Sequence, residues 1–88
     1  MRHRASPKFW ARYQSLPADI QKLADTKYEL LKANPRHPSS HLKRIAELWS
    51  VRVGDHYRAL GLDDEEGDPD GIYWIWIGTH AEYDKMLP

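Results

Sequence analysis

The sequence contains no cysteine among its 88 residues. This absence excludes a disulfide framework and a thiolate metal site, and it fits a reducing compartment. The chain also lacks any apolar run near the ~20 residues that a membrane-spanning helix needs, and no charged-then-apolar signal opens it. The spacing of His, Asp and Glu gives no convincing metal site. We therefore expect a cytoplasmic protein that contacts no membrane and needs no cofactor.

The sequence has no net charge, yet its charges are segregated. Residues 1–58 hold twelve Lys and Arg against five Asp and Glu, whereas residues 59–88 hold one Lys against eight acids. A basic region of this size attracts phosphate groups. Most of the acids of the second part lie in the run 63–71, which contains Gly and Pro and lacks the ligand spacing of a calcium-binding loop. We interpret this run as a solvated loop.

A chain of this length makes one domain, which we place over residues 1–88. Ser6-Pro7 is typical of a helix start, and a second helix is predicted over 18–33, where Asn34-Pro35 ends it. Both helices carry an apolar stripe at helical spacing, so we expect a hairpin that buries this stripe. The remaining pattern predicts extended segments at 2–5, 41–45, 48–53, 57–60 and 72–78, followed by a polar tail at 79–84.

The central element is the hairpin over residues 48–60. If its loop is residues 54–56, one face of the hairpin is apolar and the other places Arg52 directly opposite Arg58. Like charges opposite each other destabilise a strand pair, so the two arginines favour a site for an anion. Two alternatives stay open at this point. Either one arginine pairs with an acid elsewhere, or a two-residue loop shifts the register and separates the two arginines.

The order of strand, helix, helix and further strands predicts an α+β fold of two layers. The helical hairpin is expected to pack on one face of a twisted antiparallel sheet of three to four strands. The other face is expected to stay open and to carry Arg52 and Arg58. Trp74 and Trp76 share a parity in the last strand, so both indoles are expected on one side, either packed in the core or stacked on bases.

Four segments carry a resemblance to a known family: 34–38 (NPRHP), 48–54 (LWSVRVG), 57–61 (YRALG) and 74–83 (WIWIGTHAEY). In this order, with two helices before them, they resemble the RelE/ParE superfamily of bacterial toxins over nearly the whole chain. Members that resemble RelE are ribosome-dependent mRNA endonucleases, and members that resemble ParE inhibit DNA gyrase. Both kinds are held inactive by an antitoxin in type II toxin–antitoxin systems.

The resemblance implies catalytic roles for Arg58, His80, Arg52 and Tyr83. Arg58 matches the arginine that contacts the scissile phosphate, where a fork of donors is required. Arg52 adds a second phosphate clamp on the same face. His80 suits a proton donor to the leaving oxygen, and Tyr83 resembles a C-terminal tyrosine that stacks on a base. The alternatives are a surface histidine at His80 and a packed core residue at Tyr83.

A basic segment before the hairpin is the second implied part of the site. Lys43 and Arg44 match the segment that holds the RNA backbone and lowers the pKa of the 2′-OH, unless they are ordinary solvated charges. His41 is a loose match for a base.

We therefore expect the toxin of a type II toxin–antitoxin system, a ribosome-dependent mRNA endonuclease that inhibits translation. In the metal-independent reaction that the resemblance implies, the ribose 2′-OH attacks its adjacent phosphate. The expected partners are the ribosome, mRNA and a cognate antitoxin that forms a hetero-oligomer with the toxin. The alternatives are a ParE-like, non-catalytic DNA gyrase inhibitor and a non-toxic binding module of the same fold.

Overall fold

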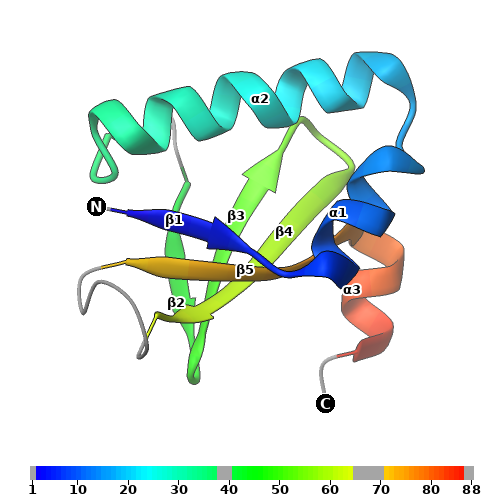
Figure 1. Cartoon of the computed structure of the whole chain (residues 1–88). Coiled ribbons are helices and arrows are strands. Elements are labelled where there is room, and N and C mark those ends of the chain that lie inside the picture. Colours follow the sequence, from blue (N-terminus) through cyan, green and yellow to red (C-terminus); the bar gives the residue numbers. More distant parts are fainter. Residues whose placement is uncertain (1, 38–40, 65–70, 87–88) are drawn as a thin grey trace.

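The structure is a computed structural model that describes residues 2–37, 41–64 and 71–86. Two helices lie over one face of a sheet, and a third helix lies at one end of it (Figure 1). In chain order the elements are β1 (His3–Ala5), α1 (Pro7–Gln14), α2 (Ala18–Ala33), β2 (Lys43–Ile45), β3 (Leu48–Val53), β4 (Tyr57–Asp63), β5 (Ile72–Thr79) and α3 (His80–Met86).

The start of α1 and both ends of α2 lie where the sequence predicts. Ser6 is the N-cap of α1, and its Oγ accepts a hydrogen bond from the backbone N–H of Phe9 at 3.1 Å. Pro7 fits the first helical position because an N–H there has no partner inside the helix. α2 ends at Asn34, since the residue before Pro35 is pushed away from helical angles.

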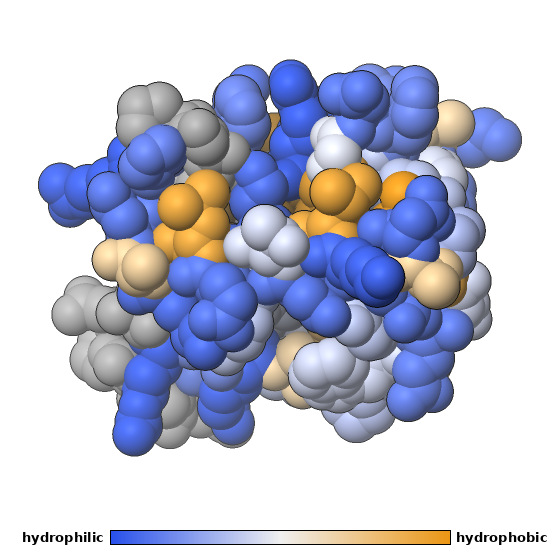
Figure 2. Space-filling view, turned by 90° about the horizontal axis from the view of Figure 1, so that it is seen from above, coloured by the Kyte–Doolittle hydropathy of each residue, from blue (hydrophilic) through white to orange (hydrophobic). Residues whose placement is uncertain are grey.

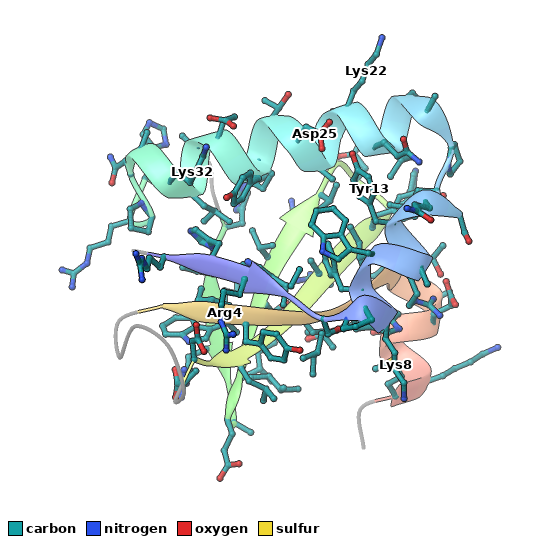
Figure 3. All side chains as sticks on the ribbon, viewed as in Figure 1. Arg4, Lys8, Tyr13, Lys22, Asp25 and Lys32 are labelled. Carbon is teal, nitrogen blue, oxygen red and sulfur yellow. The ribbon has the colours of Figure 1, made fainter. Side chains whose placement is uncertain are left out.

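Side chains hold α1 and α2 together across the short connection between them. The Nε2 of Gln21 donates to the carbonyl oxygens of Tyr13 at 3.1 Å and Leu16 at 3.2 Å. The Tyr13 hydroxyl donates to Asp25 at 2.7 Å, and Figure 3 shows these two side chains reaching toward each other from α1 and α2. The predicted helical hairpin is therefore confirmed as one layer of the fold.

The strands form one sheet in the order β1-β5-β4-β3-β2. β3 and β4 are antiparallel, with Val51 opposite Ala59 and Arg52 opposite Arg58. This is the register that the alternation in the sequence predicts. The alternative in which a shorter loop separates the two arginines is excluded.

The α+β class is confirmed, but the sheet differs from the expected one in two respects. Among the described residues it has five strands rather than three or four, and it is mixed, because β1 runs parallel to β5 from His3–Ile72 to Ala5–Trp74. β1 and β2 have only three residues each. Both lie within the extended segments predicted at 2–5 and 41–45, but strands this short carry no clear alternation, so their pairing in the sheet could not be predicted.

The hydrophobic core lies between α1, α2 and the sheet. Alternation along the strands turns one set of side chains toward the helices. The buried members of this set are Val51, Val53, Ala59, Ile72, Trp74 and Ile77, and Leu31 of α2 packs with them.

The two tryptophans of β5 lie on opposite faces of the sheet, and the expectation that they share one is wrong. Leu60 pairs with Trp76 and Gly61 pairs with Trp74, so Ile75 is an extra residue in β5. A bulge of this kind reverses the alternation beyond it. Trp74 consequently enters the core, where it is 6% exposed, and Trp76 lies on the other face.

Residues 80–86 form a helix instead of the expected polar tail, and this helix covers part of the face that was expected to be open. Thr79 and Glu82 cap each other: the Thr79 Oγ1 accepts from the Glu82 N–H, and the Glu82 Oε1 accepts from the Thr79 N–H, both at 3.1 Å. This is a capping box. It starts α3 and turns Tyr83 toward the sheet, leaving it 6% exposed.

The outer surface over α2 is mainly hydrophilic, with separate small hydrophobic areas (Figure 2). Large apolar side chains with substantial exposure on the first two helices are Trp10, Leu23 and Tyr28. Within the described ranges, no helix combines the length and hydropathy needed to cross a membrane. Residues 65–70, which make up most of the acidic run expected to be a solvated loop, lie outside the described residues.

Candidate functional site

Arg58 stands at the centre of a cationic area on the sheet face that points away from α1 and α2. Its side chain is half-buried: the guanidinium lies 5.0 Å from the ring centroid of Tyr83, and one Nη donates to the Ser50 Oγ at 3.4 Å. The Nε of Arg58 is buried and has no hydrogen-bond partner. A buried donor without an acceptor is costly, so the Arg58 guanidinium lacks one hydrogen-bond acceptor within the described part of the chain.

The other cations of this area come from neighbouring strands. Arg52 lies opposite Arg58, and Lys43 lies opposite Ser50, which is fully buried. Alternation therefore puts the side chains of Lys43, Ser50, Arg52 and Arg58 on one face. Among the described residues, no carboxylate forms an ion pair with Arg52 or Arg58. Within the described part of the chain, the alternative in which an internal acid neutralises one of these two arginines is therefore not observed.

His41 lies beside this area, just before β2. Desolvation lowers the pKa of His41 below its ordinary value of 6.5, and the charge of Arg52 lowers it further. Lys27, Lys43 and Arg58 act in the same direction. The imidazole is therefore biased toward its neutral form, which can accept a proton near neutral pH.

This electrostatic coupling gives a first prediction. Replacing Arg52 by Gln removes a nearby positive charge, so the pKa of His41 should rise toward its ordinary value without fully reaching it, because desolvation remains. A histidine titration followed by NMR measures the shift. Arg36→Gln, which removes an exposed arginine that contributes nothing to the pKa of His41, is the control and should leave that pKa unchanged.

Lys27 on α2 lies on the other side of the sheet from this area, where it lines a cleft, and the sequence alone did not single it out. Burial lowers the pKa of Lys27, and the charge of Arg52 lowers it further. The signal was present in the sequence, since Lys27 falls between Ala24 and Leu31 at the helical spacing of the buried stripe. A cation in an otherwise apolar stripe indicates a local electrostatic role.

His80 and Tyr83 reach the same area from α3. The two rings are 5.8 Å apart between centroids, and Tyr83 lies against Arg58. The Nδ1 of His80 is 3.2 Å from a carboxylate oxygen of Asp84, and both side chains are about half-exposed. This contact is made through Nδ1, so it fixes the orientation of the imidazole ring.

Arg44 is the predicted site residue that the structure does not bring into this area. It lies opposite Trp49, on the same face as Val51, whereas the neighbouring Lys43 points to the opposite face. Its guanidinium stacks 4.6 Å from the Trp49 ring and forms two hydrogen bonds to the carboxylate of Asp63, at 2.8 and 2.7 Å.

The Arg44 pair gives a second prediction. Hydrogen bonds from Arg44, and then from the indole of Trp49, lower the pKa of Asp63 to about 2. The ion pair therefore stabilises the fold above the ordinary carboxylate range, and this contribution is lost as the pH falls through about 2. In Arg44→Ala the pKa of Asp63 should rise toward 3.8, as measured by carboxylate NMR titration. An unchanged pKa would contradict the pairing.

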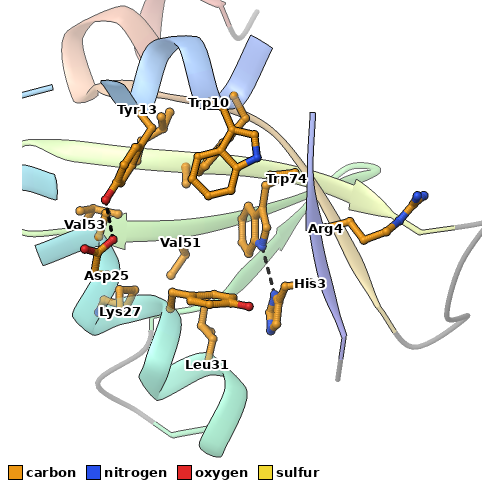
Figure 4. Close-up of a pocket in the computed structure, with 16 residues that line it drawn as sticks. His3, Arg4, Trp10, Tyr13, Asp25, Lys27, Leu31, Val51, Val53 and Trp74 are labelled. Carbon is orange, nitrogen blue, oxygen red and sulfur yellow. Dashed lines mark hydrogen bonds between the residues drawn. The ribbon is translucent and has the colours of Figure 1, made fainter. Parts of the chain in front are cut away.

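A cleft lies on the opposite side of the sheet, between β1, α1 and α2 (Figure 4). It has a volume of about 160 Å³ and a largely aromatic and aliphatic lining that includes Trp10, Tyr28 and Trp74. The His3 Nδ1 accepts a hydrogen bond from the Trp74 indole at 3.0 Å, and burial lowers the pKa of His3. This lining suits apolar packing rather than phosphate chemistry.

Known proteins that resemble this chain are found by comparing structures and not by comparing sequences. No family model matches the chain, and no curated protein matches it significantly. A chain of the RelB–RelE antitoxin–toxin complex from Methanococcus jannaschii superposes with a TM-score of 0.72 at 16% identity, over 97% of this chain and 99% of that one. The YoeB/ParE toxin from Agrobacterium tumefaciens gives 0.68 at 17% identity, over 91% and 99%. The isolated E. coli RelE toxin gives 0.64 at 12% identity, over 98% of both chains.

The chain therefore has the fold of the RelE/ParE toxins. The resemblance carried by the four sequence segments is confirmed at the level of fold.

Proposed function

We propose that this protein is the toxin of a toxin–antitoxin pair and that it cuts mRNA at the ribosome. The observation that carries the proposal is the pair Arg52 and Arg58, which lie opposite each other on one face of the sheet, neither of them in an ion pair with a carboxylate of the described residues. An RNA phosphate supplies the acceptor and the negative charge that this arrangement lacks. The fold shared with RelE toxins supports the same assignment.

The proposed reaction is an attack of the ribose 2′-oxygen on the adjacent phosphorus, with departure of the 5′-oxygen. Negative charge builds up on the non-bridging oxygens in the transition state. Arg58, backed by Tyr83, and Arg52 across the strand pair are placed to bind these oxygens. Preorganised donors aimed at developing charge are among the strongest catalytic devices, because they need not reorganise during the reaction.

Two histidines account for the proton movements. His41, whose pKa is lowered, accepts the proton of the 2′-OH, and Lys43 beside it binds the RNA backbone. His80, paired with Asp84, donates a proton to the leaving 5′-oxygen. The products are a 2′,3′-cyclic phosphate and a free 5′-hydroxyl, and the number of protons is unchanged.

Tyr83 has a different part in this proposal from the base stacking that the resemblance implies. Its ring is 6% exposed and lies against the Arg58 guanidinium. In this arrangement Tyr83 orients Arg58, and a base contacts only the margin of the ring.

The proposed partner is an antitoxin that covers the basic face. One of the similar solved structures is an antitoxin–toxin complex. A partner segment with acidic side chains would neutralise Arg52, Arg58 and Lys43 and exclude RNA from them. Co-purification with the product of a neighbouring gene tests this part of the proposal.

Expression in bacteria tests the function. Induction should stop growth and leave transcripts with new 5′ ends within translated regions, and co-expression of the antitoxin should restore growth. Growth arrest with intact transcripts and a DNA-damage response would instead support the ParE-like alternative, a gyrase inhibitor. Normal growth would support a non-toxic binding module.

A further inference from the structure

Arg12 links three elements that surround the proposed site. Its Nε donates to the carbonyl oxygen of Ile77 at 2.7 Å, and one Nη donates to the Glu82 carboxylate at 2.8 Å. Its guanidinium lies 5.0 Å from the ring of Trp76. One side chain of α1 therefore binds the last part of β5 and the first turn of α3.

The position of Arg12 follows from the short first strand. β1 pairs with β5 only from Ile72 to Trp74, so α1 rather than a strand lies along the rest of that edge. The Nε–H of Arg12 donates to the Ile77 carbonyl oxygen, in place of the backbone N–H that a neighbouring strand would supply. The guanidinium fork has donors to spare and can bind the strand and the carboxylate of Glu82 together, which an ammonium group cannot do in the same geometry.

Glu82 transmits this link to α3. Its other carboxylate oxygen accepts hydrogen bonds from the Thr79 N–H at 3.1 Å and the Thr79 hydroxyl at 3.0 Å. The Thr79 N–H, followed by Arg12, lowers the pKa of Glu82, so the carboxylate is charged at neutral pH. A seven-residue helix is marginal alone, and its position depends on such contacts.

This series of contacts ends at Arg58, the residue proposed to bind phosphate. Tyr83 directly follows Glu82 in α3, is buried, and lies against the Arg58 guanidinium at 5.0 Å. We propose that Arg12 is a positioning residue for Arg58: by tethering α3 through Glu82, it holds the Tyr83 ring against the guanidinium that grips phosphate. The geometric part of this inference stands on the structure alone, and its catalytic consequence rests on the proposed function.

Gly78 provides independent support, because it lies between Arg12 and Arg58. It pairs with Arg58 in the sheet, and a Cβ added there would come within 2.5 Å of Trp76 and 2.8 Å of the Arg12 guanidinium. The packing of Arg12 and Trp76 over this glycine leaves no space for a methyl group. Gly78→Ala should therefore displace Arg12 and give the same signature as its removal.

NMR of the Arg58 Nε–H group tests the geometric part. In the wild type this proton should carry a ring-current shift from Tyr83 and exchange slowly with water, because it is buried. Arg12→Ala should remove most of the ring-current shift and speed the exchange. Arg44→Ala is a matched control, since it also removes an arginine that stacks on a tryptophan and pairs with an acid. It should leave the Arg58 signal unchanged.

Two further variants keep the test decisive if Arg12→Ala folds poorly. Glu82→Gln preserves an acceptor for the Thr79 N–H but removes the charge that Arg12 needs, so it should give a weaker form of the same change. In the double variant the two effects should be non-additive, because both break one link. An Arg58 signal that is unaltered in folded Arg12→Ala and Glu82→Gln would overturn the proposal.

Cleavage kinetics test the catalytic consequence. Arg12→Ala should lower kcat about tenfold with little change in KM, because small misplacement of a catalytic group costs rate more than binding. An altered Arg58 signal with unchanged kcat would overturn the positioning role. If the wild type cuts no RNA, the proposed function fails, while the NMR comparison still decides whether Arg12 controls Arg58.

Discussion

Replacement of Arg58 by Ala should lower ribosome-dependent mRNA cleavage by about 10²–10³-fold, the usual cost of removing one preorganised donor from a developing negative charge. Arg58→Lys should recover only a small part of the rate. It restores the charge but neither the planar fork nor the packing against Tyr83. The measurement is the initial rate of transcript cleavage on programmed ribosomes, with the amount of folded protein checked by circular dichroism.

Arg36→Ala is the control for this experiment. Arg36 has the same side chain but lies exposed in the segment after α2, outside the cationic area. The rate of this variant should stay within about twofold of the wild type, since single exposed charges have small effects. Equal rates for Arg58→Ala and the wild type would show that Arg58 does not act on the phosphate.

Replacement of Ile72 by Ala should destabilise the fold by about 2–5 kcal/mol, the range for truncating a fully buried aliphatic side chain. Ile72 has no exposed surface and packs where β1 and β5 pair and where Gly61 of β4 approaches closely. Native domains are stable by only roughly 5–15 kcal/mol, so this loss is a large fraction of the total. Urea unfolding should show a much lower midpoint with a similar slope.

Leu62→Ala is the matched control for the stability experiment. Leu62 lies in the adjacent strand, one position from the partner of Ile72, and is 38% exposed. Truncation of this partly exposed side chain should cost clearly less than truncation of Ile72. Equal losses at the two positions would contradict the location of the core between the sheet and the first two helices.

Local patterns in the sequence were sufficient to predict the helical hairpin and the central strand pair. Ser6-Pro7 and Asn34-Pro35 set helix ends through the backbone geometry of one or two residues, and these signals do not depend on the rest of the fold. The β3–β4 register follows from alternation on both sides of a tight turn. The opposition of Arg52 and Arg58 could therefore be predicted from the sequence alone.

The parts that were missed depend on tertiary structure or on a short motif. The extra residue at Ile75 reverses the alternation of Trp74 and Trp76, and nothing local to those residues indicates it. The Thr79–Glu82 capping box was visible in the sequence, but a short polar segment after a strand is equally typical of a tail. Missing that helix also meant missing how Tyr83 covers Arg58.

The sequence predicted only part of the arrangement of the candidate site residues. Lys43 and Arg44 are neighbours in the sequence, so pattern alone gives them equal weight. In the sheet they point to opposite faces, and Arg44 binds Asp63 instead of joining the cationic area.

The central claim, that Arg52 and Arg58 together hold an RNA phosphate, is tested most directly by NMR of the arginine side chains. The protein is titrated with a short RNA in which a 2′-deoxy nucleotide at the cleavage position prevents the reaction. We predict that the Nε–H signals of Arg52 and Arg58 shift, while the signals of Arg36 and Arg44 stay in place. A response confined to Arg36 or Arg44, or no response of Arg58 at saturating RNA, would contradict the account.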